Sequence, residues 1–127
     1  MDLGMNANKF SVEEQYRQLD EAVALSRVGG DFELLREVVG LFLEDYPQAL
    51  EKIREAVGGN DSTGLERHAH SLKGSVSTFG AKEAFEAALA LEKQGRSGDL
   101  TSVTDNLLRL EQALFALKPE LEAIQAR

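Results

Sequence analysis

The chain of 127 residues contains no cysteine and no tryptophan, and only two prolines. The absence of cysteine excludes a disulfide framework, a thiolate metal site and a cysteine nucleophile. No apolar run is long enough to span a bilayer, and the N-terminus lacks the basic and then apolar pattern of a signal peptide, so a cytoplasmic location is expected. The sequence also lacks a glycine-rich phosphate loop, which predicts no ATP site and no kinase activity.

Positive charge is scarce as well. There are 14 lysines and arginines against 22 aspartates and glutamates, which gives a formal net charge of −8. Nucleic acids and anionic membranes favour a basic surface, so neither is an expected partner. Hydrophobic residues make up 43% of the chain and charged residues 28%. This composition and length are typical of one globular domain with a core of its own.

The periodicity of the apolar residues is helical throughout, and strand-like alternation is absent. Glycine clusters at 29–30, 58–59 and 95–98 separate the periodic stretches. Residues 1–18 are expected to form a flexible leader, although Ser11 and Glu14 make a capping box that can begin a helical turn. The helices predicted after it span about 20–28, 31–57, 61–80, 81–94 and 99–124, with Asp31 and Asp61 as N-caps, Pro47 as a bend and Gly95 as a stop.

The last predicted helix carries an unbroken seam of apolar residues at alternating spacings of three and four, from Leu100 to Ile124. Such a seam is compatible with a homodimeric coiled coil or with an intramolecular bundle. Four long amphipathic segments joined by short loops favour the bundle, and Pro119 inside the seam disfavours a long uninterrupted coil. The predicted fold is therefore all-α, an antiparallel up-down four-helix bundle with a short extra N-terminal helix, and the protein is expected to be monomeric.

The segment around His70 contains the candidate functional residues. One apolar helix face is formed by Leu65, Ala69, Leu72, Val76 and Phe79, which recur at spacings of four and three. His70 and Lys73 lie on a different face, three residues apart, so their side chains can reach the same point in solvent. Gly74 follows in mid-helix, where glycine costs about 1 kcal/mol relative to alanine and therefore calls for a steric reason.

These residue types suit a histidine that holds a phosphoryl group. The unperturbed pKa of histidine, about 6.5, leaves a neutral nucleophilic fraction at physiological pH. Transfer of a phosphoryl group needs mainly position and charge neutralisation, and Lys73 can supply a flexible point charge. Gly74 presents no side chain, so the active site of a partner can close over His70. Ser77 lies a further turn along and can donate a hydrogen bond to a phosphate oxygen.

Glu92 is the predicted orienting partner of His70. The turn at 80–81 joins two antiparallel helices, and His70 lies about ten residues before it and Glu92 about eleven after it, so the two are nearly level at a rise of about 1.5 Å per residue. The Glu92 carboxylate can then accept a hydrogen bond from His70 Nδ1, fix the tautomer and leave Nε2 to react.

Several stretches together resemble the histidine-containing phosphotransfer (HPt) domain of bacterial multistep phosphorelays. They are Leu65–Gly74 with its Ala-His-Ser-Leu-Lys-Gly core, Phe79–Ala81, Leu91–Glu92, and the flanking Leu41–Pro47 and Gly95–Asp99. The resemblance covers roughly residues 19–118 of the chain. It implies a helical bundle whose surface histidine accepts phosphate from an aspartate of one receiver domain and passes it to another.

By position, this resemblance makes His70 the phosphorylated residue, Lys73 the cation beside the phosphate and Gly74 the residue that gives clearance. Glu92 falls where that family often has glutamine or glutamate. The implied partners are response-regulator receiver domains and a hybrid sensor histidine kinase, and Mg²⁺ is expected on the receiver, with no cofactor on this chain. Residues 19–127 are accordingly expected to form the phosphotransfer domain.

Other interpretations of the same residues are less favoured. His68 lies about 200° around the helix from His70 and is expected to be a partly packed bystander. A metal site is disfavoured because the chain has no second histidine pair and no Glu-x-x-His motif. Lys73 and Ser77 can also be ordinary polar surface. An adaptor that binds a receiver or kinase through the same face without phosphorylation stays an alternative to the carrier.

Overall fold

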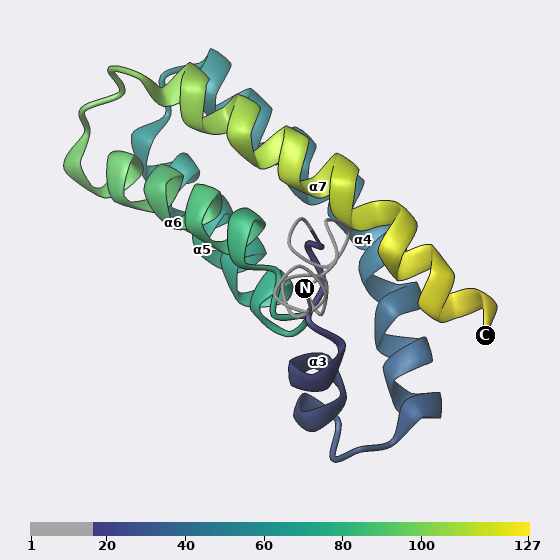
Figure 1. The fold of residues 1–127 in the computed structure, drawn as a ribbon. Helices are drawn as coiled ribbons and strands as arrows, with labels where there is room; N and C mark the ends of the chain where they lie inside the picture. Colours follow the sequence, from purple (N-terminus) through teal and green to yellow (C-terminus); the bar gives the residue numbers. More distant parts are fainter. Residues whose placement is uncertain (1–16) are drawn as a thin grey trace, which may run out of the picture.

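The computed structural model describes residues 17–127, which form five helices and no strand. The helices are α3 (Glu21–Arg27), α4 (Phe32–Gly58), α5 (Ser62–Ser77), α6 (Lys82–Ser97) and α7 (Val103–Ala126). The four long helices pack in a ring in which each contacts the next along the chain and α7 closes back onto α4 (Figure 1). The predicted up-down four-helix bundle with a short extra N-terminal helix is confirmed.

Three of these helices begin at an aspartate cap. The side chains of Asp20, Asp31 and Asp61 accept a hydrogen bond from the backbone N–H three residues on, at 3.2, 3.1 and 2.9 Å. Each cap satisfies a donor that the helix cannot pair internally and contributes about 1 kcal/mol. The two caps predicted from the sequence, Asp31 and Asp61, are both confirmed.

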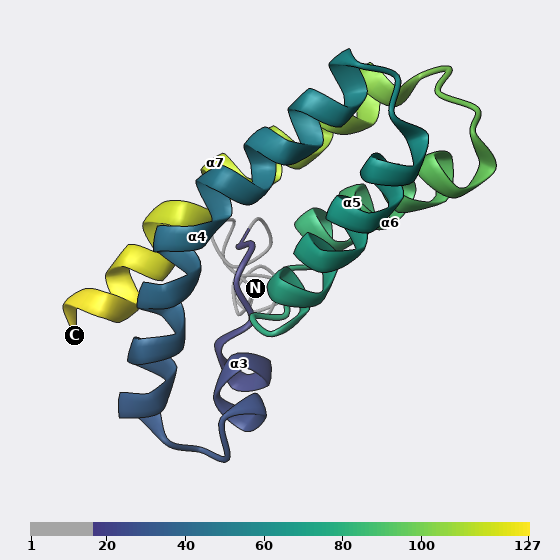
Figure 2. The same ribbon diagram turned by 180° about the vertical axis from the view of Figure 1, so that it is seen from behind.

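The seam of α7 faces the interior of the bundle. Leu110, Leu117 and Leu121 are fully buried there, and Leu114 and Ile124 are 2% or less exposed. The helices that pack against α7 are α4 and α6. The seam is therefore covered within the chain, which removes the basis for a coiled coil between two copies. Figure 2 shows α4 and α7 lying side by side, and α4 changing direction along its length.

Three predicted helix boundaries are wrong. Helix α5 ends at Ser77 and not at Gly80. Helix α6 does not stop at Gly95 but continues to Ser97, and Gly98, with a φ of +80°, follows as its left-handed cap. Helix α7 begins at Val103 rather than near Asp99, after Ser102, which has a φ of +67°. No described helix is both long enough and apolar enough to cross a membrane.

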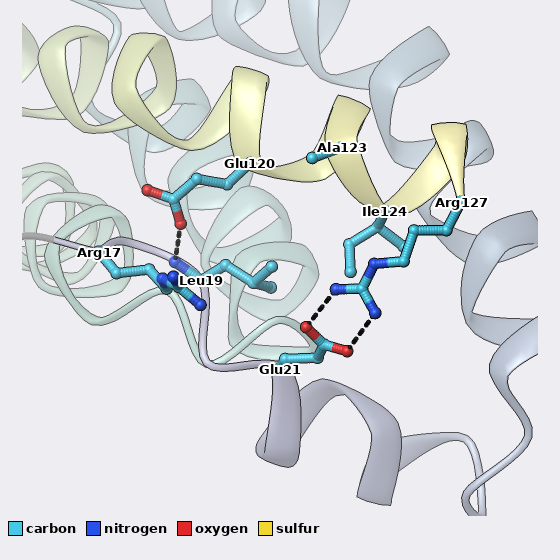
Figure 3. A pocket seen from close by; sticks show the side chains of 7 residues that line it. All are labelled: Arg17, Leu19, Glu21, Glu120, Ala123, Ile124 and Arg127. Atoms are coloured by element: carbon cyan, nitrogen blue, oxygen red, sulfur yellow. Dashed lines mark hydrogen bonds and ion pairs between the residues drawn. The ribbon is translucent and has the colours of Figure 1, made fainter. Parts of the chain in front are cut away.

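The N-terminal end of the described chain is fastened to α7 (Figure 3). The Glu120 carboxylate accepts hydrogen bonds from the backbone N–H groups of Gln18 and Leu19, at 3.0 and 2.7 Å. Arg127 forms a two-point ion pair with Glu21, at 2.6 and 2.9 Å, beside a hollow of about 420 Å³. These contacts hold the start of α3 against the bundle.

The turn between α5 and α6 supports α3 from the other side. The backbone N–H of Asp20 donates to the carbonyl of Phe79 at 2.9 Å. Gly80, with a φ of +60°, lies so close to Asp20 and Val23 that a Cβ atom there would be 2.7 Å from the Cβ of Asp20. The predicted leader lies almost wholly outside the described residues, as does its capping box.

Candidate functional site

The site is built on the contact between α5 and α6. Small residues line this contact: Ala69 in α5 and Ala84, Ala88 and Gly95 in α6 are all buried. A Cβ atom on Gly95 would lie 2.5 Å from the backbone nitrogen of Glu66 and 2.7 Å from the carbonyl oxygen of Ser62. The two backbones approach closely there, so long side chains beside the contact can meet across it.

Glu92 is the centre of the site and the only buried charged residue that the described part of the chain contains. Its Oε2 atom lies 2.9 Å from His70 Nδ1 and 2.9 Å from the Arg96 guanidinium. Its Oε1 atom lies 2.7 Å from Lys73 Nζ. Arg96 is held in turn by Glu66, whose Oε2 accepts from Arg96 Nε at 2.9 Å. One carboxylate thus collects three nitrogen groups from two helices.

These neighbours determine the charge of Glu92. The Lys73 ammonium group, 2.7 Å from Oε1, lowers the pKa of this carboxyl group below its ordinary value of 4.5, against the opposing effect of burial, and the hydrogen bond from His70 lowers it further. Glu92 is therefore ionised at neutral pH. An ionised carboxylate only accepts hydrogen bonds, so the His70 nitrogen that faces it must be a donor.

His70 consequently has two distinct ring nitrogens. Nδ1 faces Glu92 and donates the hydrogen bond, so in the neutral ring Nε2 carries the lone pair. The side chain is 67% exposed although the carboxylate that holds it is 4% exposed. The contact expected from helical rise alone, His70 Nδ1 to Glu92, is present. The arrangement presents an oriented nucleophilic nitrogen to solvent.

Lys73 does not lie free in solvent as the sequence suggested. Its side chain is only 19% exposed, because the ammonium group reaches in to Glu92. The same ammonium group lies 5.9 Å from the ring centroid of Phe85. His70 and Lys73 do converge on one point, as their spacing predicts, but that point is a buried carboxylate.

Gly74 and Ser77 have different surroundings from those of His70. A Cβ atom on Gly74 would meet nothing within 4 Å, so the described residues give no steric reason for this glycine. The Ser77 hydroxyl donates to the backbone carbonyl of Gly74 at 2.7 Å. Its single proton is therefore used within the helix, and the structure does not bring Ser77 into the network around Glu92.

His68 lies apart from this network. It is half-buried and, with Asp45, Lys52 and Ser71 among others, lines a hollow of about 220 Å³ between α4 and α5. The prediction that the two histidines do not share a site agrees with this placement. Within residues 17–127, no group of three or more potential metal-binding side chains is present.

Arg96 is the site residue that the sequence analysis missed. It lies four residues after Glu92, the spacing at which oppositely charged side chains meet on a helix. That spacing predicts an ion pair between Glu92 and Arg96, but the importance of the pair is evident only once Glu92 is known to be buried. Arg96 itself is 61% exposed and connects the buried carboxylate with Glu66 at the surface.

Comparisons with known proteins agree on one family. The family model described as the Hpt domain matches residues 37–127. The signal transduction histidine-protein kinase BarA of Shigella flexneri is 29% identical over 106 residues, which are 84% of this chain and 11% of BarA, so the chain spans about a tenth of that relative. The crystal structure of the histidine-containing phosphotransfer protein HptB from Pseudomonas aeruginosa PAO1 has the same fold, with a TM-score of 0.81 at 22% identity, over 88% of this chain and 97% of HptB.

Proposed function

The chain belongs to the Hpt domain family, and we propose that it relays phosphoryl groups on His70 between receiver domains. Membership in this family supports a histidine phosphotransfer role in phosphorelay signalling. The observation that carries the assignment to His70 is its pairing with Glu92. The 2.9 Å contact at Nδ1 fixes the tautomer, and the exposed side chain leaves Nε2 accessible to a partner.

The transfer step needs no proton movement at His70. The lone pair of Nε2 attacks the phosphorus of a phosphoaspartate in a receiver domain. The N–P bond forms, the P–O bond to the aspartate breaks, and the electron pair of that bond leaves with the aspartate carboxylate. The Nδ1 proton stays on its hydrogen bond to Glu92 throughout. Transfer to the second receiver is the reverse, with a carboxylate oxygen of that receiver as the attacking atom.

The neighbours of His70 take supporting roles in this proposal. Lys73 supplies positive charge beside the arriving phosphoryl group, in addition to holding Glu92. Gly74 is open to solvent one turn after His70, so its lack of a side chain gives room to a docked partner. The proposed phosphate contact of Ser77 has the least support, because its hydroxyl would first have to break its hydrogen bond to the Gly74 carbonyl.

The proposed partners are response-regulator receiver domains and a hybrid sensor histidine kinase. The similarity to BarA, named as a histidine kinase, supports the second of these, whether the chain acts as part of a kinase or as a separate carrier. The protein would act as a monomer in the cytoplasm, without kinase activity or a cofactor of its own. Mg²⁺ would be held by the receiver.

The test is transfer of label from a phosphorylated receiver domain to this protein. We expect labelled protein whose label is lost in acid and stable in alkali, as for a phosphohistidine. His70→Gln should accept none, whereas His68→Gln, the matched control two residues away, should accept label at the wild-type rate. Equal labelling of His70→Gln would contradict the proposal. Receiver binding without any labelling of the wild-type protein would favour the adaptor.

A further inference from the structure

Glu92 faces Nδ1 of His70, the nitrogen that does not react in the proposed transfer. Its negative charge therefore affects whether Nδ1 is protonated once His70 is phosphorylated. Once the phosphoryl group is on Nε2, a neutral ring would carry a lone pair on Nδ1. That lone pair would point at Oε2 of an ionised carboxylate 2.9 Å away, so two acceptors would face each other with no proton between them. A ring that keeps its Nδ1 proton retains the hydrogen bond and also gains a positive charge beside Glu92.

We propose that Glu92 holds phosphorylated His70 in its Nδ1-protonated, cationic form across the physiological pH range. This inference rests on the proposed function and concerns how reactive the phosphoryl group is. When the N–P bond breaks, its electron pair returns to Nε2. From the protonated ring the leaving group is a neutral imidazole, whereas from the neutral ring it would be an imidazolate anion, which is a much poorer leaving group. Glu92 therefore keeps the phosphoryl group ready for transfer.

The charge of Glu92 is secured by groups other than His70. Lys73 of α5 and Arg96 of α6 both bind the carboxylate, and Glu66 of α5 holds Arg96 in place. Helix α7, which also packs against α6, contributes no ion pair to Glu92 among the described residues. With two permanent cations present, the carboxylate stays ionised whether or not His70 is protonated.

An ionised carboxylate at this position can only accept a hydrogen bond. A glutamine amide has nearly the same shape, but it can turn its NH₂ group toward a lone pair on Nδ1 and donate to it. Glu92→Gln would therefore accommodate the neutral phosphorylated ring that Glu92 disfavours. In that variant the Nδ1 proton is expected to dissociate as the pH rises, with no change in the fold of α5 and α6.

The experiment measures hydrolysis of the phosphorylated full chain from about pH 6 to about pH 9, a range that extends well above the unperturbed histidine pKa of about 6.5. The wild-type rate should be nearly independent of pH. The rate for Glu92→Gln should fall as the pH rises, approaching about tenfold per pH unit, because only the protonated ring is labile. Glu86→Gln, an exposed position on the same helix with the same loss of charge, should keep the flat profile.

A reference that needs no variant is the wild-type phosphoprotein unfolded in urea. Its hydrolysis rate should fall with rising pH, because unfolding separates Glu92 from His70. A folded wild-type profile that falls like the unfolded one would overturn the inference, as would a flat profile for folded Glu92→Gln. Either result leaves the proposed function standing, since that proposal fails only when label does not reach His70.

Discussion

Two glycines within neighbouring helices, Gly95 and Gly74, have opposite surroundings. Gly95 lies in the contact between α5 and α6, where an added Cβ atom would lie 2.5 Å from the backbone of α5. Gly74 lies on the outer face of α5, where an added Cβ atom would meet nothing within 4 Å. The first glycine is explained by contacts within the chain, whereas the described residues leave the space beside the second open.

This comparison separates residues that assemble the site from residues on the surface that a partner would contact. The close contact at Gly95 brings Glu66 and Glu92 within reach of the same guanidinium, and so helps to assemble the network that holds His70. The open surface at Gly74 contributes nothing to that network. Substitutions in the helix contact should therefore change stability and transfer together, whereas substitutions on the outer face should change transfer alone.

Gly95→Ala should have the largest effect on stability. The new methyl group meets backbone atoms, which cannot rotate away, so the helices must separate at a cost of about 3 kcal/mol. The helical preference of alanine over glycine offsets about 1 kcal/mol of that. Urea denaturation measures the loss. Gly58→Ala at the end of α4, where a Cβ atom meets nothing within 4 Å, is the matched control, and an equal loss there would contradict the packing explanation.

Lys73→Met should have the next largest effect. The variant keeps much of the apolar stem but leaves Oε1 of Glu92 without its cation. Leaving a buried acceptor unpaired costs about 1 to 2 kcal/mol, while Arg96 still neutralises the other oxygen. Transfer to His70 should also become slower, which a receiver assay measures. Wild-type stability in this variant would mean that Lys73 is a surface lysine after all.

Acid should weaken the same interior contact. The pKa of Glu92 is lowered by its partners in the folded state, so the carboxylate adds stability above its ordinary pKa of 4.5, and that stability is lost as the pH falls through the lower folded value. The difference in unfolding free energy between wild type and Glu92→Gln should shrink as the pH falls below 4.5. A difference in unfolding free energy that grows as the pH falls below 4.5 would contradict this prediction.

Gly74→Ala should have the smallest effect on the fold and an effect in the opposite direction. The substitution adds a methyl group to open space on a helix, so stability should rise by at most about 1 kcal/mol. Transfer from a receiver should nevertheless slow, because the methyl group occupies the surface where a partner closes over His70. Thermal unfolding and the receiver assay are measured on the same sample. Unchanged transfer would remove the clearance role from Gly74.

Apolar spacing was enough to predict the helices, and counting residues from the turn was enough to pair His70 with Glu92. The end of α6 is wrong because the sequence pattern alone predicts a helix stop at Gly95. That glycine is required by the helix contact, and the cap is Gly98. The spacing of Lys73 from His70 gives no information on how deeply its side chain is buried, so the sequence alone predicts a position in solvent. Arg96 was missed because a charge four residues after another is common on helices and gains meaning only when its partner is buried.

The most direct test of the account is to identify the nitrogen that carries phosphorus. The protein is labelled with ¹⁵N-histidine, phosphorylated by a receiver domain, and studied by NMR for coupling between phosphorus and the ring nitrogens. We expect coupling to Nε2 of His70, with Nδ1 still protonated and hydrogen-bonded to Glu92. Phosphorus on Nδ1 of His70, or on either nitrogen of His68, would contradict it.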